Sequence, residues 1–406
     1  MKRVVITGMA LTSPLGSSIE ECFSSMLEFK NCIRYWDELD QYERLNTRLA
    51  ALVKNFKAPE YFNRKITRTM GTVSLYAVTT AIEALKDAGL TDNEIIQNGE
   101  TGVSYGSSSG SLDALMDFYS MKVLKEVKSI TSGSYVKMMA QTTAVNLSLH
   151  FKTTGRLYAS STACTSGSMG IGLAYEAIKN GQQTVMIAGG AEELDHTQIG
   201  IFDTLYATSL KNDTPELTPR PFDKDRDGLV IGEGAGTLIL EEYEHAKKRG
   251  AKIYAEILGF GTNTDGTHIT NPNSKTMAKA MELALKDAEI SPDKINYVNA
   301  HGTATPAGDI AETQATYSVF NRAIPISTIK SYTGHTLGAC GAIEAILSIE
   351  MSRRNWFSPN INLDNIDENC AKLDYITGEG REIKAPIIMS NNFAFGGINT
   401  SLIFKI

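Results

Sequence analysis

The sequence lacks the features that mark several common classes of protein. No apolar run is long enough to span a bilayer, and the opening MKRVVITGMA has the pattern of a first β-strand instead of a signal peptide, so we expect a cytosolic protein. Neither GxGxxG nor GxxxxGK[ST] occurs, so a nucleotide cofactor has no support. The cysteines are odd in number and include no CxxC pair, which disfavours a disulfide framework and a zinc site: Cys22, Cys32, Cys164, Cys340 and Cys370.

Positive charge is also in deficit. Lys and Arg number 39 against 46 Asp and Glu, which gives a net charge of −7 and disfavours a general nucleic-acid binder, although a local basic patch could still attract an acidic partner. One run, DKDRDGLVIGEG from Asp223, spaces its aspartates as a calcium loop does. Its twelfth position is Gly234 instead of the required glutamate, so we interpret the run as a turn.

What the sequence does contain is an alternation of short apolar strands with amphipathic helices, for example KRVVITGM and then a helix near 70–88. This alternation predicts an α/β protein with a largely buried sheet. After Gly250 the pattern restarts with KIYAEILGFG, a helix at 275–288 and the strand INYVNA. We therefore predict two similar halves, 1–250 and 251–406, in one compact body, although we find negligible residue identity between them.

Cys164 lies where the strand RLYASSTA ends in small residues and a helix begins. Amides at a helix N-terminus stabilise a thiolate and lower its pKa, which makes this the one cysteine with a reason to be nucleophilic. A buried inert cysteine is the alternative. Gly167, Gly170 and Gly172 fit a central helix that neighbouring backbones approach closely.

Two histidines lie in turns rich in glycine and threonine. His301 directly follows an apolar strand, and Thr303 and Thr305 offer hydroxyls to an amide-rich arm of a substrate. His335 lies between Gly334 and Gly338. A lone histidine is usually structural, but a Cys/His set is a standard arrangement for acyl transfer.

Further residues could support such a site. Lys330 and Glu344 flank His335 and could orient it, or they could form an ordinary ion pair. The last segment, MSNNFAFGGINTSLIF, carries Phe393 and Phe395 before a Gly–Gly pair. Its backbone amides could stabilise an oxyanion and its rings could gate a hydrophobic channel, with core packing of the rings as the alternative.

Four segments together resemble the signature blocks of the β-ketoacyl-[acyl-carrier-protein] synthases, in order and spacing over the whole chain. They are STACTSG around Cys164, HGTATPAGD around His301, KSYTGHTLGACGA around His335 and the terminal NNFAFGGIN. The opening RVVITGM and the ending SLIFKI are similar to type II elongating synthases. The resemblance implies a thiolase-type fold, with two pseudo-repeated halves in five α-β-α-β-α layers, and normally a homodimer.

The resemblance also implies the chemistry. An acyl chain passes from its carrier protein to Cys164, and malonyl-carrier protein then loses CO₂ and attacks the acyl-cysteine. His301 and His335 would assist decarboxylation, the backbone amides of Cys164 and Phe395 would receive the oxyanion, and neither metal nor nucleotide is needed. NRKITRTM would present basic residues to the acidic carrier protein, with a solvated helix end as the alternative: Arg64, Lys65 and Arg68.

The sequence departs from the family pattern at two places. Ala394 stands where the usual gating loop has glycine, and Ser109 stands where long-chain synthases often place a bulkier residue of the acyl pocket. These variants are more similar to the ketosynthases of aryl-polyene pathways. The alternatives are a degradative thiolase, which the HGTAT motif disfavours, and a chain-length-factor subunit, which lacks the nucleophile and pairs with an active ketosynthase as a heterodimer.

Overall fold

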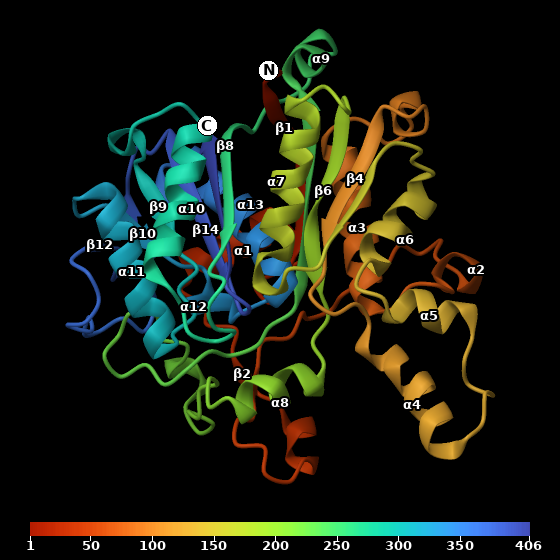
Figure 1. Ribbon diagram of the computed structural model, residues 1–406, viewed down its shortest axis with the longest axis horizontal. Coiled ribbons are helices and arrows are strands. Elements are labelled where there is room, and N and C mark those ends of the chain that lie inside the picture. The colour runs from red at the N-terminus through yellow and green to blue at the C-terminus, as the bar shows by residue number, and fades with distance from the viewer.

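The computed structural model describes all residues, 1–406, as an α/β protein built on one mixed sheet (Figure 1). Eleven strands form this sheet in the order β12-β10-β9-β14-β15-β8-β1-β7-β6-β4-β5. In that order their bounds are Asp374–Tyr375, Pro325–Ser327, Tyr297–Asn299, Ile387–Ala394, Ile398–Lys405, Ala255–Thr264, Val4–Thr12, Gly234–Glu242, Val185–Glu192, Thr101–Gly106 and Leu157–Ser160.

The two halves of the sheet meet at a short seam between β1 and β8. Only Val4, Val5 and Ile6 pair there, antiparallel to Ala255–Ile257. On either side of the seam, antiparallel strands lie next to it and parallel strands lie farther out, as β4 with β5 and β9 with β10 show. The strand order therefore repeats on both sides of the centre.

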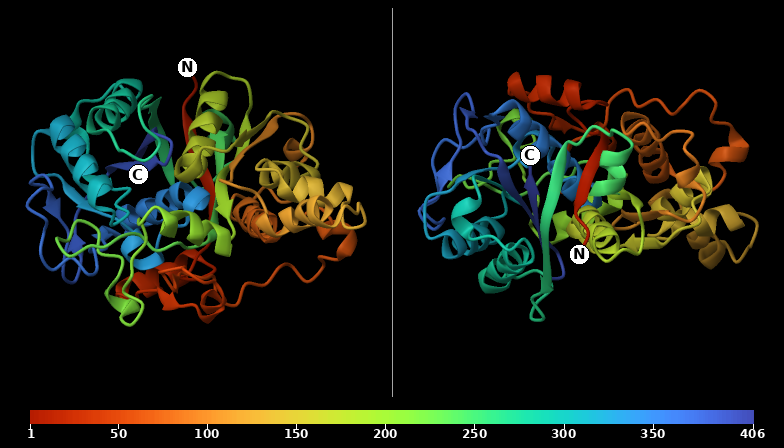
Figure 2. Two further views of the ribbon diagram at one scale, coloured as in Figure 1. Left: turned by 60° about the horizontal axis from the view of Figure 1, so that its bottom comes forward. Right: turned by 90° about the horizontal axis from the view of Figure 1, so that it is seen from above.

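Helices cover both halves and fill the space between them. On the N-terminal half, α3 (Thr72–Asp87) and α6 (Thr142–Phe151) cover the outer face, and on the C-terminal half α10 (Ser274–Asp287) and α11 (Pro306–Phe320) do the same (Figure 2). Between the halves lie α7 (Ser166–Lys179) and α13 (Cys340–Arg354), which contact strands of both. The five-layered arrangement and the pseudo-repeat predicted above are confirmed.

The repeat is visible in matching contacts. A Cβ on Gly8 in β1 would lie only 2.2 Å from the carbonyl oxygen of Ala84. A Cβ on Gly259 in β8 would likewise lie 2.3 Å from the carbonyl oxygen of Ala284. Asp87 accepts a hydrogen bond from the backbone of Met9, and Asp287 accepts one from the backbone of Phe260. The pentapeptide ALKDA occurs at both places, 84–88 and 284–288, so the repeat has a local trace in the sequence.

Smaller elements extend from these layers. On the N-terminal half, α2 (Arg64–Thr67), α4 (Leu115–Leu124) and α5 (Ser132–Met138) project beyond the sheet (Figure 1). No helix combines the length and the apolar character needed to cross a membrane. The remaining elements are α1 (Ile19–Leu27), α8 (His196–Thr204), α9 (Tyr243–Lys248), α12 (Lys330–Thr333) and the strand pairs β2 (Arg34–Tyr35) with β3 (Leu49–Ala50) and β11 (Trp356–Phe357) with β13 (Arg381–Glu382).

Candidate active site

Cys164 lies at the centre of the molecule, in the 3₁₀ turn Ala163–Thr165 that joins β5 to α7, and only 4% of it is exposed. The start of α7 is crowded, as its glycines predicted. A Cβ on Gly167 would lie 2.9 Å from the carbonyl oxygen of Gly338, and one on Gly172 would lie 2.3 Å from the ring of Phe260. The chain thus carries the cysteine into the layer between the two half-sheets.

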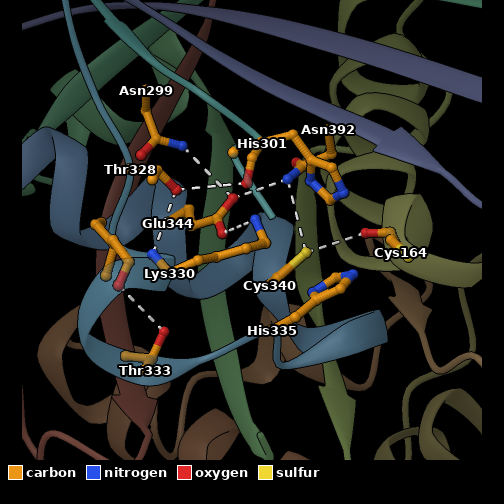
Figure 3. Close-up of polar contacts among 12 residues, drawn as sticks. Cys164, Asn299, His301, Thr328, Lys330, Thr333, His335, Cys340, Glu344 and Asn392 are labelled. Carbon is orange, nitrogen blue, oxygen red and sulfur yellow. Dashed lines mark hydrogen bonds and ion pairs between the residues drawn. The ribbon is translucent and has the colours of Figure 1, made fainter. Parts of the chain in front are cut away.

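The fold brings His301 and His335 to this cysteine. His301 follows β9 and His335 follows α12. The Sγ atom of Cys164 and a ring nitrogen of each histidine all lie within 4.8 Å of one another. The two imidazoles are 5.1 Å apart between ring centroids and nearly perpendicular, at 87° (Figure 3).

The hydrogen bonds of His335 determine where its proton lies. Its Nδ1 accepts a hydrogen bond of 3.3 Å from the backbone N–H of Leu337. A neutral imidazole that accepts at Nδ1 carries its proton on Nε2. That nitrogen is buried and has no partner within the chain, as is also true of Nδ1 of His301. Unpaired polar atoms at this depth are costly unless a ligand satisfies them.

Both imidazoles are neutral at pH 7. Burial lowers the pKa of His301 and of His335 well below its ordinary value, and the ammonium of Lys330 lowers both further. Lys330 is buried and forms an ion pair with Glu344. Although burial opposes its charge, that carboxylate raises the pKa of Lys330, so the cation persists. Asn392 donates to the same carboxylate at 2.8 Å.

The thiol of Cys164 differs from our expectation. Burial raises its pKa to about 11, and the backbone N–H groups of Phe395 and of Cys164 itself, with Lys330, offset only part of that effect. The prediction of a lowered pKa was therefore wrong: α7 begins only at Ser166, and burial of the thiol is the largest effect on its pKa. The two N–H groups nevertheless face the sulfur, where an oxyanion of a thioester would form.

A cavity of about 410 Å³ opens onto these groups. Most of the predicted residues line it: Cys164, His301, Thr303, Thr305, His335, Phe393 and Phe395. The sequence analysis missed Phe202, Glu312 and the segment 268–272 in this lining. Glu312 accepts the backbone N–H groups of His301 and Gly302, both at 2.7 Å. The segment's run HITNPN, between a strand and a helix, is a loop signal that could have found it.

The turn between β14 and β15 closes one side of this cavity. The N–H of Gly396 donates to Ile269 at 2.8 Å, and the N–H of Asp265 donates to Gly397 at 2.7 Å. Gly396 and Gly397 both have positive φ, but Ala394 does not, so alanine fits this conformation without strain. The ring of Phe395 packs against that of Phe202 at 5.9 Å.

Other predicted residues lie outside the cavity. Lys330 and Glu344 form their ion pair near the two histidines, and the Lys330 cation lowers the pKa of both rings (Figure 3). Ser109 does not line the cavity; its hydroxyl donates to Glu192 at 3.3 Å. The basic residues Arg64, Lys65 and Arg68 are exposed on and beside α2, at the surface of the N-terminal half.

Comparisons with known proteins agree with this geometry. Residues 1–246 match the family model "Beta-ketoacyl synthase, N-terminal domain", and residues 254–364 match "Beta-ketoacyl synthase, C-terminal domain". The chain is 40% identical to 3-oxoacyl-[acyl-carrier-protein] synthase 2 of Vibrio cholerae, over 100% of this chain and 99% of the relative.

Solved structures give the same result. A β-ketoacyl synthase from Burkholderia phymatum superposes with a TM-score of 0.98 at 56% identity, covering 100% of this chain and 99% of the other. A ketosynthase in complex with its chain length factor, from Xenorhabdus doucetiae, superposes with a TM-score of 0.84 at 26% identity, covering 100% and 98%. Both likenesses extend over the whole fold.

Proposed function

The chain belongs to the β-ketoacyl synthase family, and on that premise we propose that Cys164 takes up an acyl group and that His301 and His335 drive its condensation with a malonyl unit. As a member of this family the protein is a condensing enzyme of the 3-oxoacyl-[acyl-carrier-protein] synthase type. The observation that carries the residue roles is the convergence of one sulfur and two imidazole nitrogens within 4.8 Å, beside a cavity.

In the first half of the reaction the sulfur of Cys164 attacks the thioester carbonyl of an acyl-carrier protein. The bond from Cys164 to the acyl carbon forms, the bond to the carrier sulfur breaks, and the carrier leaves as a thiol with the proton that Cys164 gives up. The backbone N–H groups of Cys164 and Phe395 stabilise the oxyanion of the tetrahedral intermediate. Neutral His301 can relay this proton through its unprotonated ring nitrogen, whereas His335 cannot, because its Nδ1 already accepts the N–H of Leu337 and its Nε2 carries the proton.

In the second half, malonyl-carrier protein loses CO₂ and its electron pair passes into an enolate. The Nε2–H of His335 and a ring N–H of His301 stabilise the enolate oxygen, which fits the unpaired buried nitrogens of both rings. The enolate carbon then attacks the acyl-cysteine, the new C–C bond forms, and the thiolate of Cys164 leaves and takes a proton from solvent water. The chain grows by two carbons.

The exposed Arg64, Lys65 and Arg68 support a docking role toward an acidic carrier protein, since opposite charges steer association. Thr303 and Thr305 in the cavity wall offer hydroxyls to the arm that carries the acyl group. We keep the division into halves at Gly250, 1–250 and 251–406, as part of the same proposal.

We further propose that the protein forms a dimer through the N-terminal half. The strand β5 is one of the two free edges of the sheet, and α4 with the residues after it exposes large apolar side chains at 41–67%: Leu115, Met116, Tyr119, Met121, Val123, Leu124 and Val127. We expect a second copy of this chain to cover this surface, because most homo-oligomers pair the same face of both copies. A related ketosynthase-like subunit is the alternative, as in the chain length factor complex of the Xenorhabdus doucetiae ketosynthase.

The acyl chain is a separate proposal. We propose a conjugated chain of the aryl-polyene kind over a long saturated one, because KSYTGHTLGACG and NNFAFGGIN are similar to the ketosynthases of aryl-polyene pathways. The hydroxyls of Ser107 and Ser109 bond to Glu192 outside the cavity, so they do not support this choice. Intact-mass measurement tests this after incubation with acyl-carrier proteins that carry either saturated chains or polyunsaturated aryl chains. Preferential loading of the saturated chains would contradict it.

Release of CO₂ from malonyl-carrier protein tests the central chemistry. We expect release that depends on His301 and His335, an acyl adduct that disappears in Cys164→Ala, and no loss of either after treatment with a chelator. A thiolase would instead need free CoA and would release no CO₂. A chain-length-factor subunit would form no adduct on its own.

A further inference from the structure

Glu192, the last residue of β6, is a fully buried carboxylate for which the mechanism above has no use. Its oxygens accept four hydrogen bonds. Two come from backbone N–H groups, of Ser108 at 2.9 Å and of Gly338 at 3.0 Å. The other two come from hydroxyls, of Ser107 at 3.2 Å and of Ser109 at 3.3 Å.

These bonds meet at a junction where several backbones are in contact. A Cβ on Gly338 would lie 2.6 Å from the carboxylate of Glu192 and 2.7 Å from the nitrogen of Ser108. A Cβ on Gly190 would lie 2.4 Å from the carbonyl oxygen of Gly338 and 2.7 Å from Gly167, three residues beyond Cys164. The turn at Gly338 is therefore enclosed by β6, by the loop after β4 and by the start of α7.

The same turn determines the proton position of His335. Leu337, one residue before Gly338, is held in the left-handed region with φ +46°, and its N–H is the donor to Nδ1 of His335. A non-glycine residue stays in that region only where its surroundings hold it. The bond from the next N–H, that of Gly338, to Glu192 is such a constraint.

We propose that Glu192 is a positioning residue for decarboxylation: through Gly338 it holds the Leu337 turn that orients His335, with the Nε2–H toward the reacting thioester. The inference rests on the proposed role of His335. It assigns Glu192 no contact with substrate. The carboxylate acts as an acceptor of two backbone N–H groups, and its negative charge is not needed for that task.

The chemistry of the four donors makes a sharp test possible. In Glu192→Gln, the amide oxygen can accept the two backbone N–H groups while its NH₂ donates to the hydroxyls of Ser107 and Ser109, which can rotate to accept. In Glu192→Met, of similar length, both backbone N–H groups lose their acceptor. We expect Glu192→Met to release CO₂ from malonyl-carrier protein roughly 10- to 100-fold more slowly than the unchanged protein, and Glu192→Gln to recover most of that loss.

A structural defect would not produce the same pattern. Acylation of Cys164 by a short saturated acyl-carrier protein, followed by intact mass, should slow much less than CO₂ release in Glu192→Met. In a protein that already carries His335→Ala, adding Glu192→Met should slow CO₂ release by no more than about a further twofold, because both residues act through the ring of His335. Glu193→Met is the matched control: Glu193 is also buried, but it binds Val73, Ser111 and Leu112 instead of the Gly338 turn.

The outcomes separate the two proposals. If the unchanged protein releases no CO₂ from malonyl-carrier protein, the proposed function fails. If it does, and Glu192→Met slows acylation and CO₂ release equally, adds its full effect to His335→Ala, or is not recovered by glutamine, then Glu192 is structural only. A Glu193→Met protein that lost CO₂ release as selectively would also overturn the inference.

Discussion

At the scale of single residues, the unusual feature of the site is that its nucleophile rests as a protonated thiol and its two histidines are neutral imidazoles at pH 7. Burial raises the pKa of Cys164 to about 11 and lowers those of His301 and His335. The site therefore holds its proton until a substrate arrives, and charge appears only where the two N–H groups at Cys164 and Phe395 can stabilise it.

This account predicts the reactivity of the resting thiol. Because only the thiolate is alkylated, the rate at which iodoacetamide modifies Cys164 should rise about tenfold per pH unit from about pH 7 to pH 9, without a plateau. Mass-resolved labelling, with Cys164→Ala to identify the site, measures this rate. A plateau near neutral pH would mean that the thiol is ionised there.

The Lys330 cation gives a second prediction. It disfavours the protonated imidazoles, so removing it together with its partner, in Lys330→Met with Glu344→Gln, should raise the pKa values of both histidines. CO₂ release requires neutral rings, so its acid limb should move to higher pH. An unmoved limb in the double variant would contradict the account.

At the scale of elements, the glycines in the first strand of each half predict matched effects. Gly8→Ala and Gly259→Ala place a Cβ within 2.3 Å of a helix carbonyl oxygen, so each should destabilise the protein by about 1–3 kcal/mol or more. Gly200→Ala in α8, where no atom lies within 4 Å of the new Cβ, should be neutral or gain up to about 1 kcal/mol. Denaturant unfolding of the three variants checks this, and a harmless Gly259→Ala would contradict the equivalence of the halves.

The elements also show how far the sequence alone could predict this molecule. Strand–helix alternation and the motifs around Cys164, His301 and His335 are local, and they predicted the fold class and the residues that meet at the cavity. The pKa of Cys164 was predicted in the wrong direction because burial is set by α13 and β14, far away in the chain. The environment of Ser109 was missed for the same reason, since its partner Glu192 is 83 residues away.

At the scale of the whole molecule, the exposed apolar surface of α4 predicts an oligomer. Tyr119 and Leu124 are 61% and 64% exposed, so changing both to glutamate should prevent burial of this surface and give a species of half the mass in light scattering. Leu210→Glu, at a comparably exposed leucine elsewhere, is the control and should leave the mass unchanged. A monomeric unchanged protein, or a dimer that survives both glutamates, would contradict the proposed interface.

The central claim is that Cys164 holds the acyl group while a malonyl unit loses CO₂ and attacks it. It is tested most directly by preparing the protein with an acyl group on Cys164, adding malonyl-carrier protein and following the intact mass together with released CO₂ in a single turnover. We predict that the acyl mass leaves the protein as one CO₂ forms for each acyl group lost, and that His301→Ala and His335→Ala slow both changes together. Loss of the acyl group without CO₂, or CO₂ release while the acyl-cysteine persists, would contradict the account.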